Sequence, residues 1–80
     1  MDAFAQYSAV KIVALSKPVD AYDSWGVNSR APAIGDIGTI VEILRSEDGA
    51  VTYVVEYVNS DGSSEWLDDF TEPELTAYES

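Results

Sequence analysis

VTYVVEYV, from Val51 to Val58, is the clearest β-strand in the sequence. It consists almost entirely of β-branched and aromatic residues, which favour an extended backbone. Successive side chains of a strand point to opposite faces of the sheet. One face is therefore expected to carry Val51, Tyr53, Val55 and Tyr57, and the other Thr52, Val54, Glu56 and Val58. We predict a strand over the whole segment.

Turn sequences flank this strand on both sides. Arg45 to Gly49 ends in Asp-Gly, and Asn59 to Ser64 contains a second Asp-Gly pair, which is typical of tight hairpin connections. Before the first turn, IGDIGTIVEIL from Ile34 to Leu44 predicts a glycine turn followed by a strand of about seven residues. After the second turn, Glu65 to Leu67 is expected to start a short fourth strand.

The outer segments complete the pattern. Val10 to Leu15 predicts a first strand, and Lys17 to Pro32 a long loop without helical or strand periodicity. Thr71 to Leu75 has a proline among helix-forming residues and predicts a single 3₁₀ turn. Thr76 to Tyr78 is expected to supply a last short strand. Five short strands, a long first loop and a late 3₁₀ turn predict an all-β fold, a small five-stranded barrel.

The length of 80 residues fits one domain, residues 1–80, with a core only just large enough to hold a fold. Because cysteine is absent, packing must supply the stability. The alternation within the predicted strands places apolar residues in the core at Val10, Ile12, Ile37, Val41, Ile43, Tyr53, Val55, Tyr57 and Leu67.

GDIGTIVEI, from Gly35 to Ile43, resembles the GDxGTVVEV segment of SH3-like barrels. The chain is similar to a small uncharacterised bacterial family of that fold, in an opening strand at Tyr7 to Ile12, a hairpin at Tyr53 to Gly62 and an ending at Phe70 to Leu75. The resemblance covers most of the chain outside the long loop and implies an SH3-like barrel. Members of the family often lie beside toxin-like proteins in bacterial genomes, which implies an immunity or antitoxin role. Such motifs specify a fold and no activity.

The charge is strongly negative, with a formal net value of −11, and it is unevenly distributed. Residues 1 to 46 hold all four bases and five acids, whereas residues 47 to 80 hold ten acids and no base. Such a field repels nucleic acid and anionic lipid and attracts basic surfaces. Acidity can also serve solubility alone. We expect the acids of the second half to gather on one exposed side and to bind a basic protein partner.

Catalysis and cofactor binding find little support in the residue inventory. The chain has no histidine or cysteine, which are the usual general bases and nucleophiles. The carboxylates near Asp48 and Asp61 lack the alternating spacing of a calcium loop, so we expect no metal and no cofactor. No apolar run approaches the roughly 20 residues that span a bilayer, and Met1 to Tyr7 does not resemble a secretory signal. We therefore expect a non-enzymatic cytoplasmic protein, a monomer or small homo-oligomer that binds neither nucleic acid nor membrane.

Two kinds of residue are candidates for contact with a partner: acids that supply the field, and tryptophans that anchor the interface, since interface hot spots are rich in tryptophan. An alternative function is a peptide- or subunit-binding scaffold that uses an aromatic groove, to which Tyr22, Trp25, Trp66, Phe70 and Tyr78 are the candidates. Trp66 and Phe70 are more readily explained as core residues. The predicted partner-binding residues are Trp25, Asp61, Glu65, Trp66, Asp68, Asp69, Glu72 and Glu74.

Overall fold

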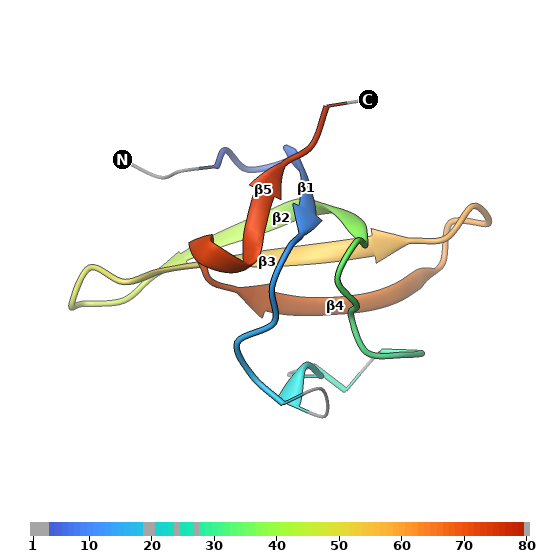
Figure 1. Cartoon of the computed structure of the whole chain (residues 1–80), viewed down its shortest axis with the longest axis horizontal. Coiled ribbons are helices and arrows are strands. Elements are labelled where there is room, and N and C mark those ends of the chain that lie inside the picture. The colour runs from blue at the N-terminus through green and yellow to red at the C-terminus, as the bar shows by residue number, and fades with distance from the viewer. Residues whose placement is uncertain (1–3, 19–20, 24, 27, 80) are drawn as a thin grey trace.

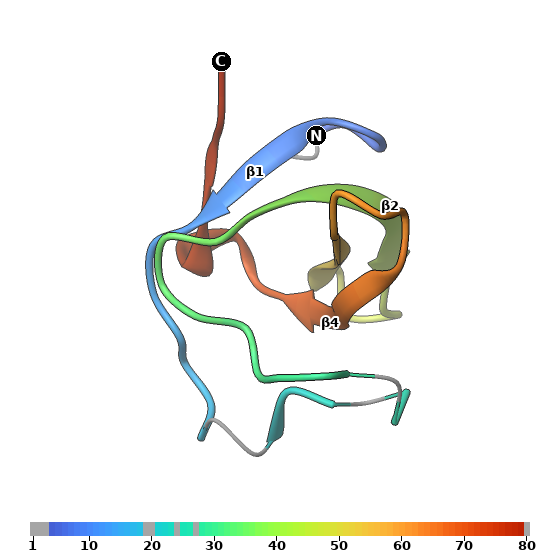
Figure 2. The same ribbon diagram turned by 90° about the vertical axis from the view of Figure 1, so that its right-hand side faces the viewer.

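Antiparallel pairing links the strands into one sheet in the computed structural model, which describes residues 4–18, 21–23, 25–26 and 28–79. The order across the sheet is β4-β3-β2-β1-β5. The strands are β1 (Ala9–Ile12), β2 (Ile37–Arg45), β3 (Val51–Val58), β4 (Ser64–Phe70) and β5 (Leu75–Ala77), and the 3₁₀ turn η2 spans Glu72–Glu74. In Figures 1 and 2, β1 and β5 run across one side of the longer β2, β3 and β4, so that the sheet curls into a small barrel. The predicted all-β fold, a small five-stranded barrel, is confirmed.

The long first loop and the late 3₁₀ turn also lie where the sequence predicts them. Within the predicted loop from Lys17 to Pro32, residues 19, 20, 24 and 27 are outside the described residues. So are residues 1–3 of the segment from Met1 to Tyr7, which was not expected to be a secretory signal. β1 ends earlier than expected, at Ile12, because the next two backbone N–H groups leave the sheet. Val13 N donates to the carbonyl of Glu74 over 2.8 Å, and Ala14 N donates to the same carbonyl over 3.4 Å.

β4 is longer than the predicted segment, and its alternation places different residues in the core. Trp66, Asp68 and Phe70 are all buried, whereas Leu67 between them is only partly buried. The prediction of Leu67 as a core residue is therefore wrong by one position in the strand. The interpretation of Trp66 and Phe70 as core residues is confirmed.

A β-bulge changes which side chains of β2 face the core. The pairing with β3 shifts between Ile40 and Glu42, so Val41 is inserted into the ladder as an extra residue. An extra residue reverses the alternation beyond it. Ile40 is fully buried and Ile43 packs against the core, whereas Ile37 is 37% exposed. The prediction of Ile37 and Val41 as core residues is thus wrong.

The core itself is small and aromatic. Tyr22 from the long loop stacks on Phe70 with ring centroids 5.4 Å apart, and Phe70 meets Trp66 edge-on at 5.6 Å. Tyr57, predicted to be buried, is only partly so and packs against this cluster. The buried cluster consists of Val10, Ile12, Tyr22, Ile40, Tyr53, Val55, Trp66, Phe70 and Leu75.

Close approach between β2 and β3 requires glycine at position 38. A Cβ atom there would lie 2.7 Å from Val55 Cγ1 and 2.8 Å from the carbonyl oxygen of Glu56. We predict that Gly38→Ala lowers the free energy of unfolding by about 1–3 kcal/mol, because the strands must separate to admit the methyl group. Thr39→Ala, at the exposed neighbouring position, should cost about 1 kcal/mol or less. Urea denaturation measures both, and an equal small loss for the two variants would refute this explanation of Gly38.

Candidate functional site

The long first loop lies against the outer edge of β4, which is an end strand of the sheet. Ser29 N donates to the carbonyl of Glu65 over 2.8 Å. The side chain of Asn28 accepts from Leu67 N over 2.9 Å and donates to the carbonyl of Tyr22 over 2.5 Å. These bonds satisfy backbone groups that an edge strand otherwise leaves open to other chains. Asn28 and Ser29 thus fix the loop to β4 after Trp25, and Asn28 also joins this part of the loop to Tyr22 before it.

A second set of contacts fixes the end of the loop through Asp36. Its Oδ2 accepts hydrogen bonds from an Arg30 guanidinium nitrogen over 2.8 Å, Ala33 N over 3.0 Å and Trp66 Nε1 over 3.0 Å. Burial raises the pKa of Asp36, but these hydrogen bonds and the Arg30 charge outweigh it and hold the pKa below its usual range. The buried indole of Trp66 thus has a structural partner and cannot touch another protein from this position.

Glu74 is a buried carboxylate, only 1% exposed, although it belongs to the predicted partner-binding acids. Its Oε2 accepts from Ser16 N over 3.0 Å and from the Tyr22 hydroxyl over 2.5 Å. Its Oε1 accepts from Thr71 N over 2.9 Å and from the Thr71 hydroxyl over 3.0 Å. Burial raises the pKa of Glu74, but the donated hydrogen bonds outweigh it and leave the pKa below its ordinary value of 4.5. Glu74 therefore serves the fold as an ionised acceptor.

Replacement of this carboxylate separates its structural role from its charge. We predict that Glu74→Gln lowers the free energy of unfolding by about 2–3 kcal/mol, because charge-assisted bonds weaken and an amide NH₂ group faces donors. Glu72→Gln in the same turn removes the same charge from an exposed site and should change stability by about 0.5 kcal/mol or less. Chemical denaturation at neutral pH compares the two, and equal losses would contradict the structural role of Glu74.

The lowered pKa of Glu74 also predicts a dependence on pH. The unfolded chain takes up this proton near pH 4.5, whereas the folded chain resists protonation to lower pH. The stabilisation is therefore complete above pH 4.5 and is lost as the pH falls through the folded-state pKa. Unfolding measured from pH 7 down to pH 3 should show the gap between the wild type and Glu74→Gln narrowing only in the acid range. If the difference in unfolding free energy between the two proteins stays constant with pH, the pKa of Glu74 is not lowered by folding.

The predicted partner-binding residues do not form one surface. Trp25 is 47% exposed and stands on the fixed loop, while Asp61 and Glu72 are exposed. Glu65 and Asp69 are partly buried. The remaining three are buried in the barrel: Trp66, Asp68 and Glu74.

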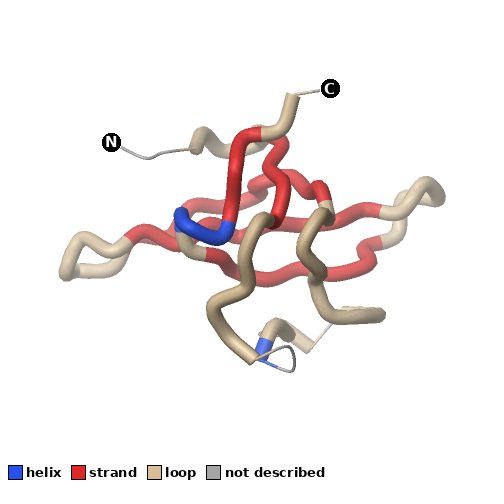
Figure 3. Tube along the Cα trace, viewed as in Figure 1, coloured by secondary structure: helices blue, strands red, loops and turns tan. Residues whose placement is uncertain are grey.

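The hairpin acids are also far apart. The turn with Glu47 and Asp48 and the turn with Asp61 project at opposite ends of the long, 36 Å axis (Figures 1 and 3). Glu72 lies in η2, which follows the end of β4 where Phe70 pairs with Tyr53. The expectation that the second-half acids gather on one exposed side is therefore wrong. The reason is that a strand, its two turns and the 3₁₀ turn distribute neighbouring sequence positions over different sides of a barrel.

Lys17 and Arg30, two of the few bases, are engaged within the molecule. Lys17 Nζ lies 3.6 Å from an Asp69 carboxylate oxygen and 4.5 Å from the centre of the Tyr22 ring. Arg30 pairs with Asp36 at 2.8 Å and with Glu65 at 3.5 Å. These contacts pair positive charge with partly buried acids. The exposed turn acids keep their charge, and hydrogen bonds from Ser46 and Ser63 to Asp48 and Asp61 lower the pKa values of those two groups.

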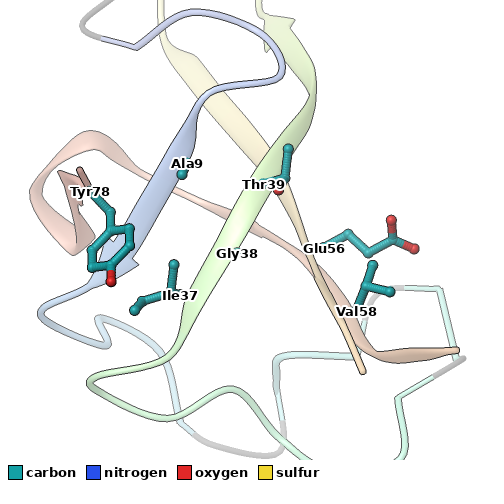
Figure 4. A pocket seen from close by; sticks show the side chains of 7 residues that line it. All are labelled: Ala9, Ile37, Gly38, Thr39, Glu56, Val58 and Tyr78. Carbon is teal, nitrogen blue, oxygen red and sulfur yellow. The ribbon is translucent and has the colours of Figure 1, made fainter. Parts of the chain in front are cut away.

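The predicted aromatic groove does not exist as such, because Tyr22, Trp66 and Phe70 stack with one another in the core. A different hollow opens on the outer face of the sheet, a shallow pocket of about 260 Å³ that we call the outer-face groove (Figure 4). It is lined by Ala9, Ile37, Gly38, Thr39, Glu56, Val58 and Tyr78.

Sequence reasoning assigned Ile37 to the core and so missed this groove. The alternation of β3 did contain a signal, because it places Val58 on the face opposite to the core residues Tyr53 and Val55. An apolar residue on a solvent-facing strand position is a candidate contact residue when others lie beside it.

Among the residues that the structure describes, no group of three or more carboxylates is arranged to hold a metal ion. None of the helical segments in that part of the chain is long and apolar enough to cross a membrane. The fold and the surface together define a small acidic all-β barrel. No protein-family model matches the chain, and the curated proteins and solved structures likewise contain no match.

Proposed function

We propose that this chain is a non-enzymatic binding protein that associates with a basic partner protein, as an inhibitor of the immunity or antitoxin type. The observation that carries the proposal is the internal use of Lys17 and Arg30 in a chain of net charge −11. The partly buried acids Asp36, Glu65 and Asp69 pair with these positive charges, and the turn acids Asp48 and Asp61 are exposed to solvent. A toxin-like or nuclease-like protein with a positive cleft is the complementary partner, and the cytoplasm is the proposed compartment.

The state of the carboxylates supports binding over catalysis. A carboxyl group that acts as a general acid near neutral pH needs a raised pKa. The pKa values of Asp36 and Glu74 are lowered, as are those of Asp48 and Asp61 in the turns. These four groups are therefore fixed anions, suited to holding hydrogen bonds or to attracting positive charge.

Charge acting over distance should appear in the association rate. We predict that reversing both Asp61 and Glu72 to Lys slows association with the basic partner about ten-fold or more at low ionic strength, with little change in dissociation. The rates should converge as salt shortens the screening length to about 8 Å near 0.15 M. Stopped-flow or surface-based kinetics on the partner captured from source cells measures this. Asp61→Asn with Glu72→Gln is the matched control and should lie between wild type and the reversal, whereas association rates unaffected by all these changes would contradict the proposal.

A second candidate function is a peptide- or subunit-binding scaffold that uses the loop aromatic. The exposed Trp25 favours it, because tryptophan is common among interface hot spots and the loop is joined to β4 a few residues later by Asn28 and Ser29. This function predicts that Trp25→Ala abolishes binding and that salt has little effect. The kinetics of the charge variants and of Trp25→Ala therefore separate the two functions.

A further inference from the structure

The outer-face groove brings three exposed apolar side chains together from segments far apart in the sequence. Ile37 begins β2, Val58 ends β3 and Tyr78 follows β5, and they are 37%, 50% and 37% exposed. Figure 4 shows Tyr78 and Ile37 on one side of the Gly38 backbone and Glu56 and Val58 on the other.

The size of the groove fits protein side chains better than a metabolite. Small-molecule sites usually have volumes of roughly 300–1,000 Å³ and enclose most of the ligand. This groove is smaller, about 260 Å³, and opens to the surface. It has room for one or two apolar side chains presented by another protein.

The charge of the chain indicates what kind of protein would place an apolar side chain in the groove. The Glu56 carboxylate lies at the edge of the groove, where it accepts a hydrogen bond from the Ser64 hydroxyl. Glu79 follows Tyr78 directly, while Lys11 pairs with Ile37 in the sheet and is the base nearest in register. Two copies of this chain would each bring a net charge of −11 to the contact. Their repulsion opposes self-association, and the groove suits an occupant of opposite charge.

We propose that the outer-face groove receives an apolar side chain, flanked by lysine or arginine residues, from the basic partner. This inference deepens the proposed function and rests on it: the scattered acids attract the partner, and the groove fixes its position. The apolar contact would be made after the encounter. Its loss should therefore raise the dissociation rate, in contrast to the charge reversals, which act on association.

Short peptides test the groove without the natural partner. The probes are the blocked peptides Lys-Lys-Leu-Lys-Lys, Lys-Lys-Gly-Lys-Lys and Glu-Glu-Leu-Glu-Glu, followed by NMR titration of the amide and methyl signals. The lysine-flanked leucine peptide should shift the signals of Ile37, Val58 and Tyr78 in a saturable manner. The other two peptides should bind at least about three-fold more weakly. The glycine peptide lacks the apolar side chain, and the glutamate-flanked peptide lacks the positive charges.

Conservative variants then assign the site. Val58→Thr and Ile37→Thr keep a β-branched side chain on the strand and should each weaken the leucine peptide by roughly three- to ten-fold. Leu44→Thr is the matched control, since Leu44 is 45% exposed on β2 outside the groove, and it should bind as wild type. Unchanged amide spectra away from the substitution show that each variant is folded.

The outcomes distinguish this inference from the proposed function. Equal binding of the leucine and glycine lysine peptides would overturn the groove while leaving charge attraction in place. Equal binding of the leucine peptides with basic and acidic flanks would overturn the basic occupant. Shifts that lie outside the groove would overturn the inference as well, whereas the charge-reversal kinetics test the proposed function independently.

Discussion

The carboxylate of Glu74 joins three parts of the chain that would otherwise be independent. It accepts hydrogen bonds from Ser16, after β1, from Tyr22 in the long loop and from Thr71 before η2. A buried carboxylate is costly unless it is fully hydrogen-bonded, so this arrangement selects one position of the loop. The Tyr22 ring then stacks on Phe70 and completes the core. The loop that carries Trp25 is thereby part of the barrel.

Local sequence was enough to predict where the strands and turns lie. It was not enough to predict which side chains of β2 and β4 point into the core. β3 has the predicted bounds, and both Asp-Gly turns lie where expected, because alternation and turn chemistry act within a few residues. The bulge at Val41 depends on pairing with β3 and leaves no pattern in β2 alone. The inward face of β4 is set by packing of Trp66 against Phe70 and the loop, which the segment itself does not determine.

The same limit applies to the surface. Net charge follows from composition, but whether a given acid is buried depends on distant donors: Ser16 and Glu74 are 58 residues apart. Sequence reasoning therefore treated Glu74 and Asp68 as surface charges, and it missed the groove that Ile37 shares with Val58. The folded chain divides its acids into two groups with different roles. Buried ones such as Glu74 hold the loop, and exposed ones such as Asp61 and Glu72 provide the field proposed to attract a partner.

The separation of the acids into buried structural groups and exposed groups depends most on Glu74 remaining ionised inside the protein. A titration of the side-chain carboxyl carbons by NMR measures its ionisation directly. With the signals of Glu74 and Asp36 assigned, the account predicts midpoints below the ordinary values of 4.5 for Glu74 and 3.8 for Asp36. A Glu74 midpoint at or above 4.5 would mean that burial outweighs the donated hydrogen bonds. It would contradict the role of this carboxylate in holding the loop to the barrel.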